Sequence, residues 1–300
     1  MPSWNGLLNE ANTLGSKYDV LRRRYLEALH EKTGRNVIVY YSGWLQKPQL
    51  QHSGLSITDD DKIGIMSAVH KLDRDKGLDL ILHTPGGETA ATEAIVDYLR
   101  QMFGADGVRA VVPQLALSGG TMIACSCSSI LMGKHSSLGP VDPQLRGIPA
   151  HGVIEEFETA RQEIAASAAN IPLWQPIIAK YTPAFIGECQ KAIKWSKELV
   201  SEWLTTGMLA DDADRDAKIE RIVEELTDHS LTLSHSRHLS AEKCRSMDLV
   251  VEMLEDEQEL QEAVLSVHHA CMLTLAHTGA FKMIENHLGI AFIRSAAAKK

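Results

Sequence analysis

Short apolar runs alternate with amphipathic stretches through the first half of the chain. The runs are rich in Val, Ile, Leu and Tyr, as is typical of buried strands, and they occupy residues 37–41, 78–83 and 108–112. The stretches that follow them predict helices at residues 59–72, 88–102 and 121–127. This alternation continues as far as Gly139 and predicts an α/β fold, in which βα units surround a parallel sheet.

The two ends of the chain have a more helical pattern. Apolar residues at helical spacing over residues 18–29 predict a helix that Gly34 ends. Residues 151–228 predict three or more helices, and residues 240–294 predict further helices with a strand near residues 249–253. The predicted breaks in the first of these regions are Pro172, Pro176 and Pro183. We expect a helical segment at residues 1–35, an α/β core at residues 36–150 and a mostly helical part at residues 151–300.

Composition limits the classes of protein to consider. Apolar residues make up 44% and charged residues 23% of the chain, which is ordinary for a globular protein. Aromatic residues are scarce at 5%, so the core must consist mainly of Leu, Ile, Val, Ala and Met. The net charge of −9 argues against nucleic acid as a partner, because phosphate binding requires a basic surface.

Cysteine usage and hydropathy indicate a cytoplasmic protein without a transmembrane segment. The five cysteines form no CxxC pair and predict buried free thiols in a reducing compartment. The first 25 residues contain no continuous hydrophobic stretch, so we expect no signal peptide. The most apolar region, residues 108–132, is interrupted by Pro113, Gly119 and Gly120 and fails as a membrane span.

Two glycine-containing turns lie at the ends of neighbouring predicted strands, where α/β folds bind their ligands. In the first, Gly86 and Gly87 stand immediately before a helix, so backbone N–H groups can point outward without interference from a side chain. In the second, Ser118 stands at a strand-to-helix corner before Gly119 and Gly120. Each turn alone is explained by local structure, the serine as a helix cap. Together they place backbone donors and a nucleophile in one crevice.

The same segments resemble a known family. They are His83-Thr-Pro-Gly-Gly, Ser118-Gly-Gly-Thr-Met-Ile-Ala and Ser137-Leu-Gly-Pro-Val-Asp-Pro-Gln144. The chain resembles the Clp-fold serine proteinases of the serine dehydrogenase proteinase (SDH) family, which are related to signal peptide peptidase A and to the proteolytic subunit of Clp protease. The likeness is strongest over residues 36–145 and continues more weakly into the C-terminal helices.

This resemblance implies a Clp/crotonase-like spiral of ββα units and a serine-type endopeptidase that acts on peptides or proteins. It implies Ser118 as the nucleophile, with Gly86, Gly87 and the Gly119 amide around the oxyanion. It also implies that no cofactor is needed and that the chain forms a homo-oligomer.

The general base is the open question, because a serine hydroxyl needs a partner that removes its proton. A Clp-type histidine is expected about 25 residues after the serine, where the chain has Val141-Asp142-Pro143 instead, and His135 comes too early. We therefore expect a lysine, whose pKa falls in a desolvated pocket. The candidates are Lys191 and Lys197 on one predicted helix, with Lys180 as a further possibility.

Two other functions remain open at this point. The fold could carry out crotonase-like hydration or isomerisation of acyl-CoA, which uses similar oxyanion geometry with carboxylates in place of the serine. The chain could also be a non-catalytic oligomeric scaffold in which Ser118 only caps a helix.

A metal site is not predicted, because the thirteen histidines include no HExxH and no zinc-finger spacing. His235 and His238 are separated by one helical turn, and we expect them to be solvated or structural.

Overall fold

The computed structural model describes residues 18–50, 52–227 and 237–296. Its centre is a seven-stranded sheet in the order β10-β5-β3-β2-β1-β11-β12. The strands are β1 (Asn36–Ser42), β2 (Leu78–His83), β3 (Val108–Val112), β5 (Ile130–Met132), β10 (Val251–Met253), β11 (Ala280–Asn286) and β12 (Ala291–Ser295). Neighbours from β10 to β1 are parallel, whereas β11 and β12 join antiparallel. The chain is therefore a mixed α/β protein with a mostly parallel sheet.

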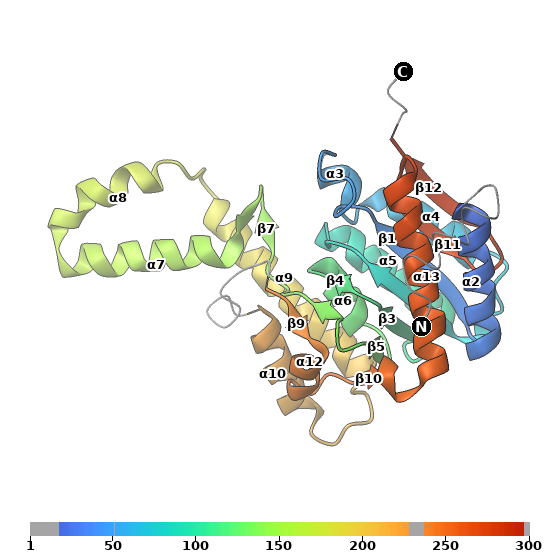
Figure 1. Ribbon diagram of the computed structural model, residues 1–300. Coiled ribbons are helices and arrows are strands. Elements are labelled where there is room, and N and C mark those ends of the chain that lie inside the picture. Colours follow the sequence, from blue (N-terminus) through green and yellow to red (C-terminus); the bar gives the residue numbers. More distant parts are fainter. Residues whose placement is uncertain (1–17, 51, 228–236, 297–300) are drawn as a thin grey trace.

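Helices cover both faces of this sheet (Figure 1). One face packs against α2 (Tyr18–Thr33) and α13 (Gln258–His277), which lie side by side. The other face packs against α4 (Asp59–Val69), α5 (Thr89–Phe103), α6 (Gly119–Cys125) and α9 (Phe185–Thr206). Along β2, Leu80 and Leu82 join the second of these cores and Ile81 joins the first. The strand is apolar on both sides because it is buried on both sides.

A smaller sheet lies beside the ends of the parallel strands. It consists of β4 (Leu115–Ala116), β6 (Ser137–Leu138) and β9 (Leu239–Ser240). A bridge between Thr84 and Ala116 connects this sheet to the chain that leaves β2. The smaller sheet thus brings the segment before Ser118 next to the segment after His83.

An arm extends away from the sheet (Figure 1). It begins at the hairpin of β7 (Gln144–Leu145) and β8 (Ile148–Pro149), continues through α7 (Ala150–Ala166) and α8 (Ile171–Ile178), and returns along α9. The other helices are α3 (His52–Leu55), α10 (Arg215–Thr227) and α12 (Ala241–Ser246), with short 3-10 turns at Arg74–Lys76, Ala168–Asn170 and Leu254–Asp256. None of the helices built from described residues is long and apolar enough to cross a bilayer.

Most predicted elements of the first half are confirmed. The strands at residues 37–41, 78–83 and 108–112 correspond to β1, β2 and β3. The helices α2, α4 and α5 and the strand β10 also lie where the patterns place them. All five cysteines are free and buried, as predicted. His235 lies outside the described residues.

The prediction of helices through residue 294 is wrong at its end, where β11 and β12 form an antiparallel hairpin. The apolar pattern of β11 is hidden because it contains buried polar residues with partners elsewhere in the chain. Lys282 pairs with Asp61, and Asn286 Nδ2 donates to the Ala68 carbonyl at 2.7 Å. The predicted break at Pro176 is also wrong, because this proline lies inside α8.

Candidate active site

The turn after β2 is held from both sides. The N–H of Gly86 donates to the buried Thr84 Oγ1 at 3.1 Å, and the Gly86 carbonyl accepts from the Ile57 N–H at 2.8 Å. Gly86 has φ +92°, in the region that favours glycine. A Cβ on Gly87 would lie 2.2 Å from Ile57 N, so only glycine allows segment 56–58 to approach this closely. The bridge to Ile57 had no signal in the sequence, since Ile57 is about 30 residues away from the turn.

The turn before α6 places Ser118 in a strained backbone conformation. Ser118 has φ 51° and ψ −115°, and the Gly120 N–H donates across the turn to the Leu117 carbonyl at 2.8 Å. A non-glycine residue in such a region costs about 1–3 kcal/mol, and such residues cluster at functional sites. The Ser118 side chain makes no capping hydrogen bond to α6. Helix capping therefore does not explain the serine.

The two turns meet. A Cβ built on Gly86 would lie 2.6 Å from the Ser118 Cβ and 2.8 Å from the Gly119 N. A Cβ built on Gly119 would lie 3.3 Å from the Gly87 N. Within the described ranges, the N–H groups of Gly87 and Gly119 have no protein acceptor. The structure thus brings together the four residues predicted for the nucleophile and the oxyanion, and leaves two backbone donors free beside the hydroxyl.

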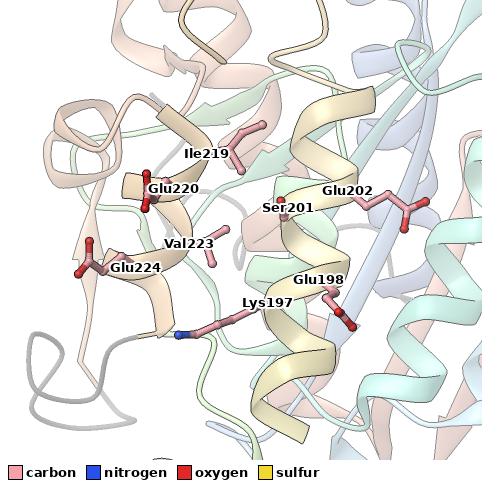
Figure 2. A pocket seen from close by; sticks show the side chains of 8 residues that line it. All are labelled: Lys197, Glu198, Ser201, Glu202, Ile219, Glu220, Val223 and Glu224. Carbon is pink, nitrogen blue, oxygen red and sulfur yellow. The ribbon is translucent and has the colours of Figure 1, made fainter. Parts of the chain in front are cut away.

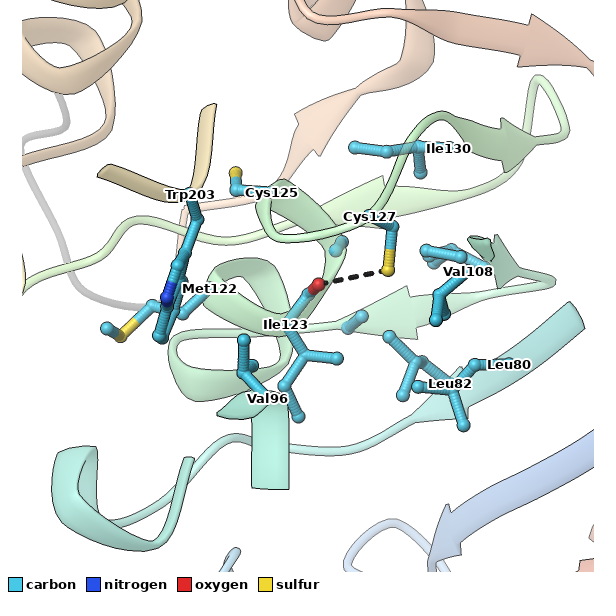
Figure 3. Packing of buried hydrophobic residues seen from close by; sticks show 14 of the residues in the cluster. Leu80, Leu82, Val96, Val108, Met122, Ile123, Cys125, Cys127, Ile130 and Trp203 are labelled. Atoms are coloured by element: carbon cyan, nitrogen blue, oxygen red, sulfur yellow. Dashed lines mark hydrogen bonds between the residues drawn. The ribbon is translucent and has the colours of Figure 1, made fainter. Parts of the chain in front are cut away.

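The helix that follows Ser118 is fixed by a dense core (Figure 3). Met122 lies beside Trp203 of α9, and Ile123 points toward Val96 of α5. On the other side of the turn, the Gly139 N–H donates to the buried Thr121 Oγ1 at 3.0 Å. This packing gives the serine a rigid support, as an active-site group requires.

The lysines predicted as bases, Lys191 and Lys197, lie on α9. Lys191 is exposed, and Lys197 lines a pocket of about 650 Å³ between α9 and α10 (Figure 2). Four carboxylates share that pocket, those of Glu198, Glu202, Glu220 and Glu224, whereas Ser118 does not line it. Among the described residues, no hydrogen bond joins Ser118 to either lysine. Lys180 is exposed on the chain between α8 and α9.

The histidines near the site do not contact Ser118 in the described part of the chain. The side chain of His83 is fully buried between Trp44, Tyr41 and His268, and neither ring nitrogen has a hydrogen-bond partner. Burial lowers the pKa of His83 to about 3, so its ring is neutral. His135 is exposed in the loop before β6. No three His, Cys, Asp or Glu side chains of the described residues converge as a metal site would require.

Comparisons with known proteins identify the family of the chain. Residues 16–268 match the family of ClpP-like SDH-type serine proteinases. The uncharacterized protein MJ1495 of Methanocaldococcus jannaschii is 28% identical over 240 residues, which cover 78% of this chain and 73% of that protein. The uncharacterized protein MJ0137 of the same organism is 40% identical over 102 residues, which cover 34% of this chain and 35% of that protein.

Among solved structures, a mutant of the membrane-bound stomatin-specific protease 1510-N aligns with a TM-score of 0.42 and 19% identity, over 69% of this chain and 79% of that chain. This likeness is too low to carry a comparison of the sites. The family match does not depend on it, because that match spans more than four fifths of the sequence, from α2 into α13. The chain therefore belongs to the ClpP-like SDH-type serine proteinases.

Proposed function

We propose that the chain is a serine endopeptidase that forms an acyl-enzyme through Ser118. The Ser118 Oγ attacks the carbonyl carbon of a peptide bond, and a base accepts the hydroxyl proton. The N–H groups of Gly87 and Gly119 stabilise the negative charge that develops on the carbonyl oxygen. The proton then passes to the leaving amine, and water releases the acyl group. The N–H of Gly86 is bonded to Thr84, so Gly86 does not donate to the oxyanion. Its role in the site is that it has no side chain.

One observation carries this proposal. The strained, uncapped serine lies directly against Gly86, beside two N–H groups that have no acceptor among the described residues. Gly119 is buried, and buried backbone N–H groups are almost always paired, so its free N–H beside a hydroxyl favours a role in binding. Gly87 is exposed, so its free N–H is accessible to a ligand. Membership of a serine proteinase family supports the same chemistry. Homo-oligomer formation and a cytoplasmic location stay predictions.

A fluorophosphonate probe tests the nucleophile. We expect the wild-type protein to gain the mass of one phosphonyl group, located on Ser118 by peptide mapping, and Ser118→Ala to gain none. The same substitution is expected to abolish peptide cleavage. Equal labelling of both proteins would contradict the assignment, and would leave crotonase-like acyl-CoA chemistry or a scaffold as the function of this fold.

For the base, we propose a lysine of α9, with Lys191 and Lys197 as the candidates. Lys191 is exposed and Lys197 is half-buried on α9. Because neither is buried in the core, Lys191→Ala and Lys197→Ala are expected to keep the fold. Loss of a general base lowers the rate by about 10²–10⁴-fold. The variant that removes the base should therefore label at least about a hundredfold more slowly than wild type. Wild-type labelling rates in both variants would exclude both lysines.

A further inference from the structure

A buried ion pair lies behind the turn that carries Gly86 and Gly87. Lys282 of β11 and Asp61 of α4 are both 0% exposed, and their Nζ and Oδ2 atoms are 2.8 Å apart. Burial lowers the pKa of Lys282, opposed by the charge of Asp61. Removing two charges from water is costly, and a buried pair is weak evidence of stability by itself. The role of the pair is therefore best inferred from the groups to which it is bonded.

The pair binds the backbone on both sides of Ile57. Lys282 Nζ donates to the Ser56 carbonyl at 2.6 Å, and Asp61 Oδ2 accepts from the Thr58 N–H at 2.9 Å. Both contacts are charge-assisted hydrogen bonds, which are stronger than those between neutral groups. The position of segment 56–58 is thus fixed by Lys282 and Asp61 together.

Ile57 in turn fixes the peptide between Gly86 and Gly87. The Ile57 N–H donates to the Gly86 carbonyl at 2.8 Å, and the Ile57 carbonyl accepts from the Glu88 N–H at 3.0 Å. In a planar trans peptide, the C=O and the following N–H point in opposite directions. Because the Gly86 carbonyl faces Ile57, the Gly87 N–H must face away from it, toward Gly119.

The carboxylate that holds segment 56–58 is itself fixed from β1, because Tyr40 Oη donates to Asp61 Oδ2 at 2.8 Å. Within the turn, the Gly86 N–H donates to Thr84 Oγ1 at 3.1 Å. Asp61 is therefore linked to the Gly86 carbonyl through segment 56–58.

We propose that Lys282 and Asp61 are positioning residues for the oxyanion hole, which aim the Gly87 N–H at the oxygen of the bound carbonyl. The proposal rests on the proposed function, since it concerns the same reaction. Neither side chain touches the substrate. Their effect is transmitted through Ile57 and Gly86, and it acts on the transition state because negative charge develops on the oxygen as the carbonyl is attacked.

The test measures the rate at which Ser118 is phosphonylated at increasing concentrations of a fluorophosphonate, which separates the maximal rate from the concentration for half-saturation. Lys282→Met is the main variant. The matched control is Glu285→Gln, because Glu285 lies on the same strand, is 0% exposed and pairs with the buried Arg22, but bonds to neither segment 56–58 nor the turn. Both are measured well below their unfolding midpoints.

We expect Lys282→Met to lower the maximal rate at least about tenfold, with half-saturation nearly unchanged, since removal of a whole oxyanion donor costs about 10²–10³-fold. Glu285→Gln is expected to keep the wild-type rate. Equal rates in the two variants would overturn the proposal. If wild type itself shows no labelling that depends on Ser118, the proposed function fails instead, so the two failures are distinguishable.

A double variant covers the case in which Lys282→Met does not fold. Asp61→Leu with Lys282→Met replaces the pair by apolar side chains of similar size, which proteins often tolerate without loss of stability. It lacks both anchors of segment 56–58. A folded double variant with a rate at least about tenfold below wild type supports positioning, and a wild-type rate contradicts it.

Discussion

Replacement of Gly86 by alanine is expected to lower the rate at which a fluorophosphonate phosphonylates Ser118 at least about a hundredfold. The new Cβ would lie 2.6 Å from both the Ser118 Cβ and the Leu117 carbonyl oxygen, closer than such atoms can approach. One of the two turns must therefore move, which separates the hydroxyl from the N–H groups of Gly87 and Gly119. The rate is measured by intact-protein mass after exposure to a fluorophosphonate.

The chain offers a matched control for backbone strain. Gly34 also has a positive φ, +67°, but a Cβ there would meet nothing within 4 Å. Gly34→Ala is expected to cost roughly 1–2 kcal/mol of stability and to keep the wild-type rate of phosphonylation. If Gly86→Ala is phosphonylated as fast as Gly34→Ala, the turns do not meet in the way that the proposed reaction needs.

The largest expected loss of stability comes from Glu285→Gln, at about 3–5 kcal/mol. The Glu285 carboxylate is fully buried, pairs with the fully buried Arg22, and accepts from Arg23 Nε at 2.9 Å. In Glu285→Gln the Arg22 guanidinium keeps a neutral amide oxygen at position 285, with Thr274 and the half-exposed Asp19 as further partners, but loses its buried counter-charge. Breaking one partner of a buried pair leaves an uncompensated charge, which is why the loss is large. Urea unfolding measures it.

An exposed ion pair serves as the comparison. Lys194 and Glu198 lie 3.6 Å apart on α9 with 74% and 64% of their side chains exposed. Lys194→Ala is expected to leave the urea midpoint unchanged, because water and ions screen such pairs. A loss below about 1 kcal/mol in Glu285→Gln would show that the buried carboxylate is not a structural link between α2 and β11.

The first half of the fold was predictable because its signals are local. Each parallel strand up to β3 is a short apolar run, and each turn after it is marked by glycine. The hairpin of β11 and β12 was not predictable in this way. Lys282 and Glu285 look like surface residues in the sequence, and their burial depends on Asp61 and Arg22, more than 200 positions earlier.

The same distinction between local and long-range signals holds for the candidate site. The conjunction of Ser118 with Gly86 and Gly87 could be predicted, because both turns follow apolar runs in neighbouring βα units. The short strand β4, which leads directly into Ser118, had no such signal. The contact of Ile57 with Gly86 could not be predicted. It is a hydrogen bond between backbone groups, which does not depend on the residue type at position 57. Whether a lysine of α9 can act as the base depends on how α9 lies against α6. Periodicity in the sequence shows which residues share a face of one helix, but it does not show which other helix that face contacts.

The central claim is that one serine and two backbone N–H groups act on the same carbonyl, and a crystal structure of the fluorophosphonate adduct tests it most directly. We predict the phosphorus atom on Ser118 Oγ, with the phosphonyl oxygen about 2.7–3.1 Å from the N atoms of both Gly87 and Gly119. An adduct on another residue, or a phosphonyl oxygen on Ser118 that points away from both N–H groups, would contradict the account.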